Sequence, residues 1–167
     1  MNAYESLSLQ TNLVISDDII KDAYDQTTGE EQHLSARNTL LNPPTRLKEW
    51  MVTHNIEVAR HTMIPNELVT LFSSLSGLIN EVSQLSKKRE GATTLLAQTL
   101  LDKELFQKKP LLDELASTLQ QHQIDTLAHF PKIQENHCAE TANTTLQTLK
   151  FLQKWEMELN NAYTMLL

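Results

Sequence analysis

The sequence is poor in the residues that build disulfide-linked and β-sheet proteins. It holds one cysteine, Cys138, and three glycines among 167 residues. A single cysteine excludes an internal disulfide framework and is typical of a protein in a reducing compartment. Few glycines, few β-branched runs and long stretches rich in Leu, Gln, Thr and Glu favour helices over a sheet. We therefore predict an all-α protein.

The sequence also lacks a surplus of basic residues and any long apolar run. Its formal net charge of −7 disfavours binding to nucleic acids and to anionic membranes, which attract clustered Lys and Arg. The one concentrated basic run, Lys87-Lys88-Arg89, is followed by Glu90 and is typical of a solvated helix end. No stretch has the length and apolarity of a membrane span, and residues 1–5 lack the features of a signal peptide. We expect a cytoplasmic protein.

A proline pair marks the clearest local structure. Asn42 precedes Pro43, and a residue before proline is biased away from the helical region. A helix that begins near Glu30 is therefore expected to end at about Leu41. Pro43 or Pro44 can open the next helix, where a missing N–H costs nothing. The apolar face of this next helix is predicted at Leu47, Trp50 and Met51.

Leucines at alternating spacings of three and four residues predict the longest helices. The first set follows Pro65 and comprises Leu68, Leu71, Leu75, Leu78, Val82 and Leu85. A second set follows Pro110, where we expect the pattern to restart after an interruption at Gly91, and comprises Leu112, Leu115, Leu119 and Leu127. The last set, on a helix expected from about Glu135, comprises Leu149, Leu152, Trp155, Leu159, Ala162 and Leu166. Whether residues 92–109 continue the first of these helices is left open by the pattern.

These patterns divide the chain into three parts. Residues 1–55 are predicted to form a short helical unit, and residues 56–64, which have no strong period, a linker. Residues 65–167 are predicted to form an antiparallel bundle of the three-helix type, because long amphipathic helices with short connections pack in that way.

The order of these elements resembles the HscB family of iron–sulfur cluster co-chaperones, which carry an N-terminal J-domain. The resemblance rests on the Ile20-x-x-Ala23-Tyr24 helix, the elbow at residues 36–51, the segment 65–69, and Leu149-Lys150-Phe151-Leu152-Gln153-Lys154. It implies a J-like N-terminal unit and a bundle that binds an iron–sulfur scaffold protein. The positions that match the family's partner-binding residues are Leu68, Val69, Phe72 and Phe151, which are our candidate partner-binding site.

The sequence departs from the family in the residues that act on a chaperone. J-domains trigger ATP hydrolysis in a DnaK- or HscA-type partner through a His-Pro-Asp tripeptide, and this chain has none. The corresponding loop is residues 26–30, and the helix before it is acidic where the family presents Lys and Arg. We therefore predict a degenerate J-like unit that does not stimulate a chaperone. The family's glutamates beside the partner-binding positions are also absent, and the matching places hold Ser73, Ser76 and Asn80.

Histidine and cysteine form no pattern typical of a metal site or a catalytic centre. His54 and His61 lie seven residues apart, whereas paired ligands on a helix usually lie three or four apart. Cys138 follows His137, but neighbours on a helix point about 100° apart. His122 is interpreted as a partly buried bundle residue. We predict no enzymatic activity, no metal and no other cofactor.

Three functional hypotheses follow. The first is a non-enzymatic protein-binding module of HscB-like descent that has lost the chaperone-activating motif. The second is a co-chaperone that still binds an iron–sulfur scaffold protein through its bundle. The third is a structural helical subunit that self-associates through its Leu-rich seams.

Overall fold

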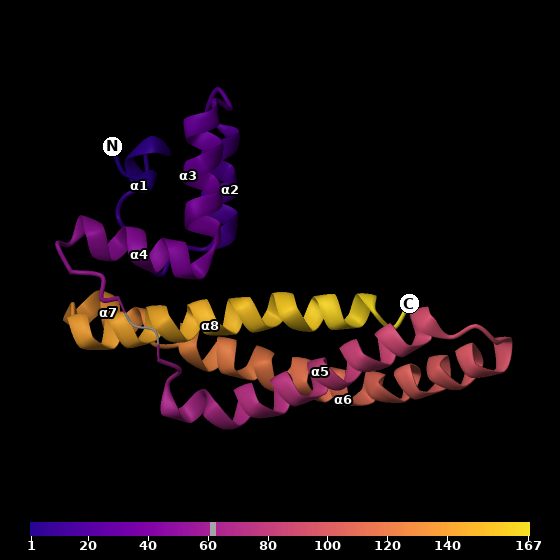
Figure 1. The fold of residues 1–167 in the computed structure, drawn as a ribbon. Helices are drawn as coiled ribbons and strands as arrows, with labels where there is room; N and C mark the ends of the chain where they lie inside the picture. The colour runs from indigo at the N-terminus through magenta and orange to yellow at the C-terminus, as the bar shows by residue number, and fades with distance from the viewer. Residues whose placement is uncertain (61–62) are drawn as a thin grey trace. The chain divides into compact units, whose positions relative to one another are not determined.

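The computed structural model describes residues 1–60 and 63–167, and the regular structure of these residues is entirely helical, which confirms the predicted all-α class. Figure 1 shows the elements in chain order. They are α1 (Ala3–Ser6), α2 (Asp17–Asp25), α3 (Glu31–Leu41), α4 (Pro43–Thr53), the 3₁₀ helix η1 (Asn66–Leu68), α5 (Val69–Gly91), α6 (Leu95–Leu127), α7 (Phe130–Asn136) and α8 (Ala139–Thr164).

The chain forms two compact units, and neither is continuous in sequence. Unit 1 comprises Met1–Thr62 and Asp125–Lys150, and unit 2 comprises Met63–Ile124 and Phe151–Leu167. Helices α6 and α8 therefore contribute to both units. The boundaries predicted from the sequence, 1–55, 56–64 and 65–167, follow the chain and miss the share of residues 125–150 in unit 1. Part of the predicted linker, residues 61 and 62, lies outside the described residues.

The proline elbow forms as predicted. Helix α3 ends at Leu41, Asn42 is extended with φ −92° and ψ 115°, and Pro43 opens α4. The hydroxyl of Thr45 closes the turn by donating to the carbonyl oxygen of Thr39 at 2.6 Å. Because a helical backbone is disfavoured before a proline, the extended Asn42 marks the point where the chain leaves α3 and begins α4.

The core of unit 1 has two parts, and the larger one explains why residues 125–150 belong to it. The first part lies among α1, α2 and α3 and comprises Tyr4, Leu7, Ile15, Ile20, Ala36 and Leu40. The second joins α4 to α7 and the start of α8 and comprises Leu13, Leu47, Trp50, Met51, Phe130, Ile133, Ala142, Leu146 and Leu149. The apolar face of α4 predicted from the sequence is thus buried, but against residues from the far end of the chain.

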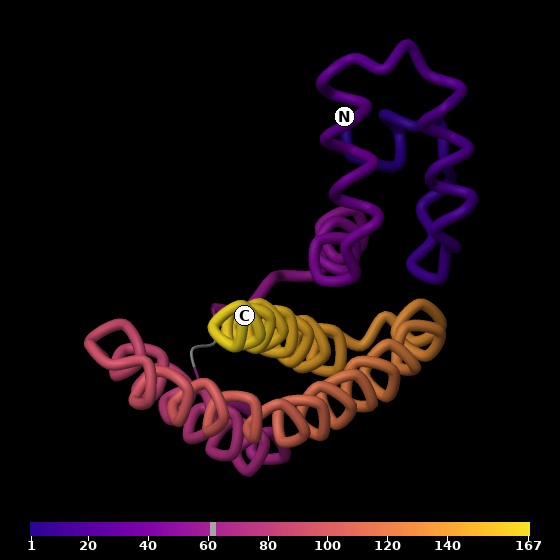
Figure 2. The backbone as a smooth tube through the Cα atoms, turned by 90° about the vertical axis from the view of Figure 1, so that its right-hand side faces the viewer, coloured from indigo at the N-terminus to yellow at the C-terminus, as the bar shows by residue number. Residues whose placement is uncertain are grey.

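Unit 2 is a three-helix bundle of α5, most of α6 and the C-terminal part of α8, which run alongside one another in Figures 1 and 2. The predicted seams supply most of its core, but the predicted seam residues Leu127 and Leu149 pack in unit 1 instead. The buried residues are Leu68, Leu71, Leu75, Leu78, Val82, Leu105, Leu112, Leu119, Leu152, Trp155, Leu159 and Ala162. Leu85 and Leu166 pack against this core while remaining partly exposed.

Pro110 does not begin a helix, contrary to the prediction. Helix α5 ends at Gly91, and α6 starts at Leu95 and continues through Pro110 as one helix. A proline inside a helix costs about 3 kcal/mol, since it removes one backbone hydrogen bond and crowds the preceding turn. Leu105 and Leu112 are buried on either side of it, so packing holds both halves of α6 on the same core. Pro110 itself is exposed.

The start of the final helix also differs from the prediction. Residues around Glu135 belong to the short helix α7, which contains Pro131 at its start and ends at His137, and α8 begins only at Ala139. His137 adopts a left-handed conformation with φ 52°, and its N–H donates to the carbonyl oxygen of Ile133. Left-handed caps are normally glycines, so the sequence pattern gave no indication of this break.

Candidate functional site

Two of the four candidate partner-binding residues, Phe72 and Phe151, flank Trp155. This indole lies in the core of unit 2 and is 2% exposed. The centroid of the Phe72 ring on α5 lies 5.7 Å from the centroid of the indole. The Phe151 ring, on the same helix as Trp155, lies at the same distance from it. Two phenylalanines from helices far apart in sequence therefore flank one buried indole. Their proximity depends on the register in which α5 and α8 pack, which the sequence pattern does not determine.

Three of the four candidates are accessible, and the fourth is not. Val69 is 45% exposed, Phe72 is 37% exposed and Phe151 is half-buried. Leu68 is 1% exposed, because it lies in η1 at the start of the core seam and its side chain packs inward. Leu68 therefore positions the start of α5 and offers no surface to a partner. We call the set Val69, Phe72 and Phe151 the aromatic surface.

The α5 residues bordering the aromatic surface are polar and uncharged. Ser73, Ser76 and Asn80 are all exposed on this helix. On α8, the exposed Lys154 lies one helical turn from Phe151. Ile79 packs against the core, as its place beside the seam suggested. An apolar centre whose α5 border is uncharged is suited to a largely apolar partner surface and gives little long-range attraction from that side.

The loop between α2 and α3 is held by its own contacts. The Thr27 hydroxyl donates to the carbonyl oxygen of Tyr24 at 2.6 Å and accepts from the N–H of Gly29 at 3.2 Å. Gly29 has φ 73°, the left-handed conformation that glycine adopts without strain. Arg37 lies over the Tyr24 ring at 5.4 Å. The helix before this loop exposes the acidic residues Asp17, Asp18, Asp22 and Asp25.

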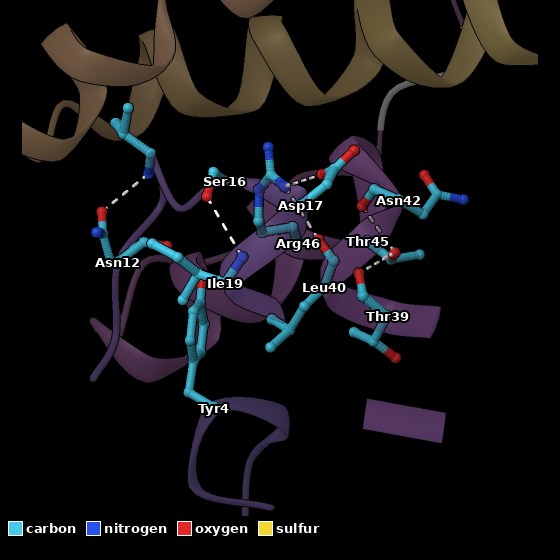
Figure 3. A network of polar contacts seen from close by, with 11 residues as sticks. Tyr4, Asn12, Ser16, Asp17, Ile19, Thr39, Leu40, Asn42, Thr45 and Arg46 are labelled. Atoms are coloured by element: carbon cyan, nitrogen blue, oxygen red, sulfur yellow. Dashed lines mark hydrogen bonds and ion pairs between the residues drawn. The ribbon is translucent and has the colours of Figure 1, made fainter. Parts of the chain in front are cut away.

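Arg46 is a buried charged residue of unit 1, and its contacts hold the fold of that unit together. Figure 3 shows its guanidinium donating to the carbonyl oxygen of Leu40 at 3.0 Å, with a carboxylate oxygen of Asp17 at 3.9 Å. It also lies over the ring of Phe130 at 5.6 Å. Burial lowers the pKa of Arg46, and burial raises the pKa of Tyr4, whose hydroxyl donates to a backbone oxygen. These contacts join the elbow to α2 and α7, so a catalytic role is not needed to explain them.

The histidines lie in places that the sequence pattern did not reveal. The rings of His54 and His137 contact each other edge to face at 4.8 Å, and His54 stacks on Trp50 at 4.3 Å. His54 ends α4 and His137 ends α7, and 83 residues separate them, which is why spacing rules missed the pair. His61 lies outside the described residues. Among the described residues, no group of three or more His, Cys, Asp or Glu is arranged to hold a metal ion.

His122 and Cys138 are the remaining residues that the sequence analysis considered. His122 is half-buried, as predicted, and lines a groove of about 480 Å³ between α5 and α6 with Leu71, Leu111 and Leu115. Cys138 is exposed, and a hydrogen bond from the Thr141 hydroxyl lowers the pKa of its thiol. Among residues 1–60 and 63–167, no helix is both long enough and apolar enough to cross a membrane.

Comparisons of the chain with models of protein families, with characterised proteins and with solved structures gave no match.

Proposed function

We propose that this chain is a non-enzymatic protein-binding module of HscB-like descent that captures a partner through the aromatic surface. The observation that carries the proposal is that Phe72 and Phe151 flank Trp155 while remaining accessible. Large aromatic side chains held by a rigid core lose little entropy on binding and dominate interface energetics. Val69 extends this apolar centre along α5.

The decisive experiment compares partner capture by the native chain and by the double variant Phe72→Ala/Phe151→Ala. Because a central interface aromatic contributes about 2 kcal/mol or more, each truncation is expected to weaken capture about 30-fold, and the double variant should lose it. The bait is the tagged full-length chain in an extract of its native cells, with bound proteins identified by mass spectrometry and affinity then measured with the purified partner.

The matched control is Met157→Ala, which truncates an exposed apolar side chain on α8 outside the aromatic surface. It should leave capture unchanged. Circular dichroism must show that the double variant keeps its helices, since both rings contact the core residue Trp155. Undiminished capture by a folded double variant would reject the aromatic surface as the binding site, and unfolding of the double variant would assign both rings to the core.

A second prediction is that the purified chain does not accelerate ATP hydrolysis by a DnaK- or HscA-type chaperone. The loop from Gln26 to Glu30 has no His-Pro-Asp tripeptide, and the acidic surface of α2 would repel an acidic chaperone site. The measurement is a steady-state ATPase assay at micromolar concentrations, with an authentic J-domain protein as positive control. A several-fold stimulation by this chain would contradict the prediction.

The identity of the captured protein separates the remaining hypotheses. An iron–sulfur scaffold protein is the alternative partner, and it is supported by the match of Val69, Phe72 and Phe151 to the family's binding positions. The missing glutamates at the border of the surface count against it. Recovery of a scaffold protein would favour the co-chaperone hypothesis, and recovery of the chain alone would favour a self-associating structural subunit.

A further inference from the structure

The first three turns of α6 expose an unusual concentration of large apolar side chains. Leu95 is 80% exposed, Leu96 71%, Leu100 54% and Phe106 68%. At about 100° per residue, these four side chains share an arc of about 140° on one side of the helix. The core residue Leu105 projects from the opposite side. The face formed by these four residues therefore points away from the bundle.

Packing within unit 2 does not account for this face. No residue between Val82 and Leu105 is buried, so the end of the α5–α6 hairpin lacks a core of its own. Figure 1 shows this end projecting past the C-terminal end of α8, the third helix of the bundle. The four side chains line neither the groove that Glu81 and Lys108 border nor the groove that Leu71 and His122 border. They form a convex apolar surface that the described residues leave uncovered.

The same end of the hairpin is basic in an otherwise acidic chain. Residues 87–109 hold six of the fourteen Lys and Arg residues but only three of the twenty-one acidic ones. Arg89 pairs with Asp102, Lys108 with Glu81 and Lys109 with Asp113. The remaining three cations are exposed and form no ion pair with any described residue. They are Lys87, Lys88 and Lys103.

We propose that the hairpin end, residues 87–109, docks on the surface of an anionic lipid membrane. In this arrangement Leu95, Leu96, Leu100 and Phe106 enter the boundary between headgroups and acyl chains, and the unpaired lysines contact lipid phosphates. Lys103 lies within the apolar arc, and its four-carbon chain allows the ammonium group to reach the headgroup level.

Charge and shape favour a lipid surface over other occupants. A second copy of the chain docked here about a two-fold axis would bring two basic hairpin ends together, and like charges across an interface oppose association. A partner helix normally binds in a groove, whereas this apolar surface is convex. The net charge of −7 weakens attraction of the whole chain to an anionic membrane, but screening confines electrostatics to about 10 Å. The local charge at the hairpin end therefore decides whether it binds.

The test is co-sedimentation of the full chain with vesicles of phosphatidylcholine, with and without phosphatidylglycerol. Three unpaired lysines near an anionic surface, opposed by Glu90 and Glu104, leave one net positive charge, which is expected to strengthen binding about fivefold when phosphatidylglycerol is present. Added salt should weaken that gain. The double variant Leu95→Asn/Leu96→Asn should bind at least about tenfold more weakly than the native chain, because it removes two of the inserted side chains.

The matched control is Ile124→Asn/Met157→Asn, which makes the same change at two exposed apolar residues of unit 2 outside the hairpin end. It should bind vesicles as the native chain does. Equal binding to both vesicle types would overturn the proposal, as would native binding by the Leu95/Leu96 variant. Light scattering tests whether a second copy of the chain occupies this face instead. The proposal would be overturned in favour of a second copy if the native chain self-associates without binding vesicles and the Leu95/Leu96 variant no longer self-associates.

Discussion

Replacement of Trp155 by alanine should destabilise the bundle of unit 2 by about 3–5 kcal/mol, the cost typical of truncating a buried aromatic residue. The indole is 2% exposed and packs in the core shared by α5, α6 and α8. Its removal leaves a cavity and also withdraws the support of Phe72 and Phe151. Chemical denaturation followed by circular dichroism measures the effect as a lowered midpoint at constant slope.

The control for Trp155→Ala is Met157→Ala, two residues away on the exposed face of α8. Substitutions at such positions usually change stability by less than about 0.5 kcal/mol. A Trp155→Ala variant with the native midpoint would show that the indole is not part of a packed core. It would also remove the physical basis for a rigid aromatic surface.

The sequence was most informative where a local rule acts without help from distant residues. The elbow followed from Asn42 preceding Pro43, because local sterics disfavour a helical backbone at the residue before a proline. The leucine seam of α5 was equally clear, because each of its turns contributes one inward side chain to a single core. Both features depend on chain geometry that a few neighbouring residues determine.

Predictions failed where tertiary packing overrides a local preference. Pro110 normally interrupts a helix, but burial of Leu105 and Leu112 keeps α6 continuous. Leu68 received two competing predictions. It belongs both to the seam and to the positions matched by resemblance, and only packing shows that the core takes its side chain.

The aromatic surface could be predicted in part. Phe72 and Phe151 were predicted as partner-binding positions from the resemblance, but their common contact with Trp155 depends on the register between α5 and α8. The hairpin end was not predicted at all. Leu95 and Leu96 look like core residues in a sequence, and only the absence of a third helix beside them leaves them exposed.

The unit boundaries were the least accessible part of the fold, and they lead to the last prediction. A fragment that ends at residue 62 should not fold cooperatively. In the full chain, residues from α7 and α8 cover Leu13, Leu47, Trp50 and Met51, which are at most 1% exposed. Each such side chain gains about 1.5–3 kcal/mol from burial, so uncovering several of them removes an amount comparable to the whole stability of a small domain, about 5–15 kcal/mol.

Thermal melts and amide dispersion in NMR spectra of the 1–62 fragment measure this loss. The control joins residues 1–62 to residues 125–150 through a Gly/Ser linker, which restores Phe130, Ile133 and the other covering residues of unit 1. That chimera should regain a sigmoidal melt and dispersed amide signals, because the complete core is again present. A cooperative transition in the 1–62 fragment alone would mean that the core among α1, α2 and α3 is sufficient by itself. Residues 125–150 would then dock on an already folded unit rather than complete it.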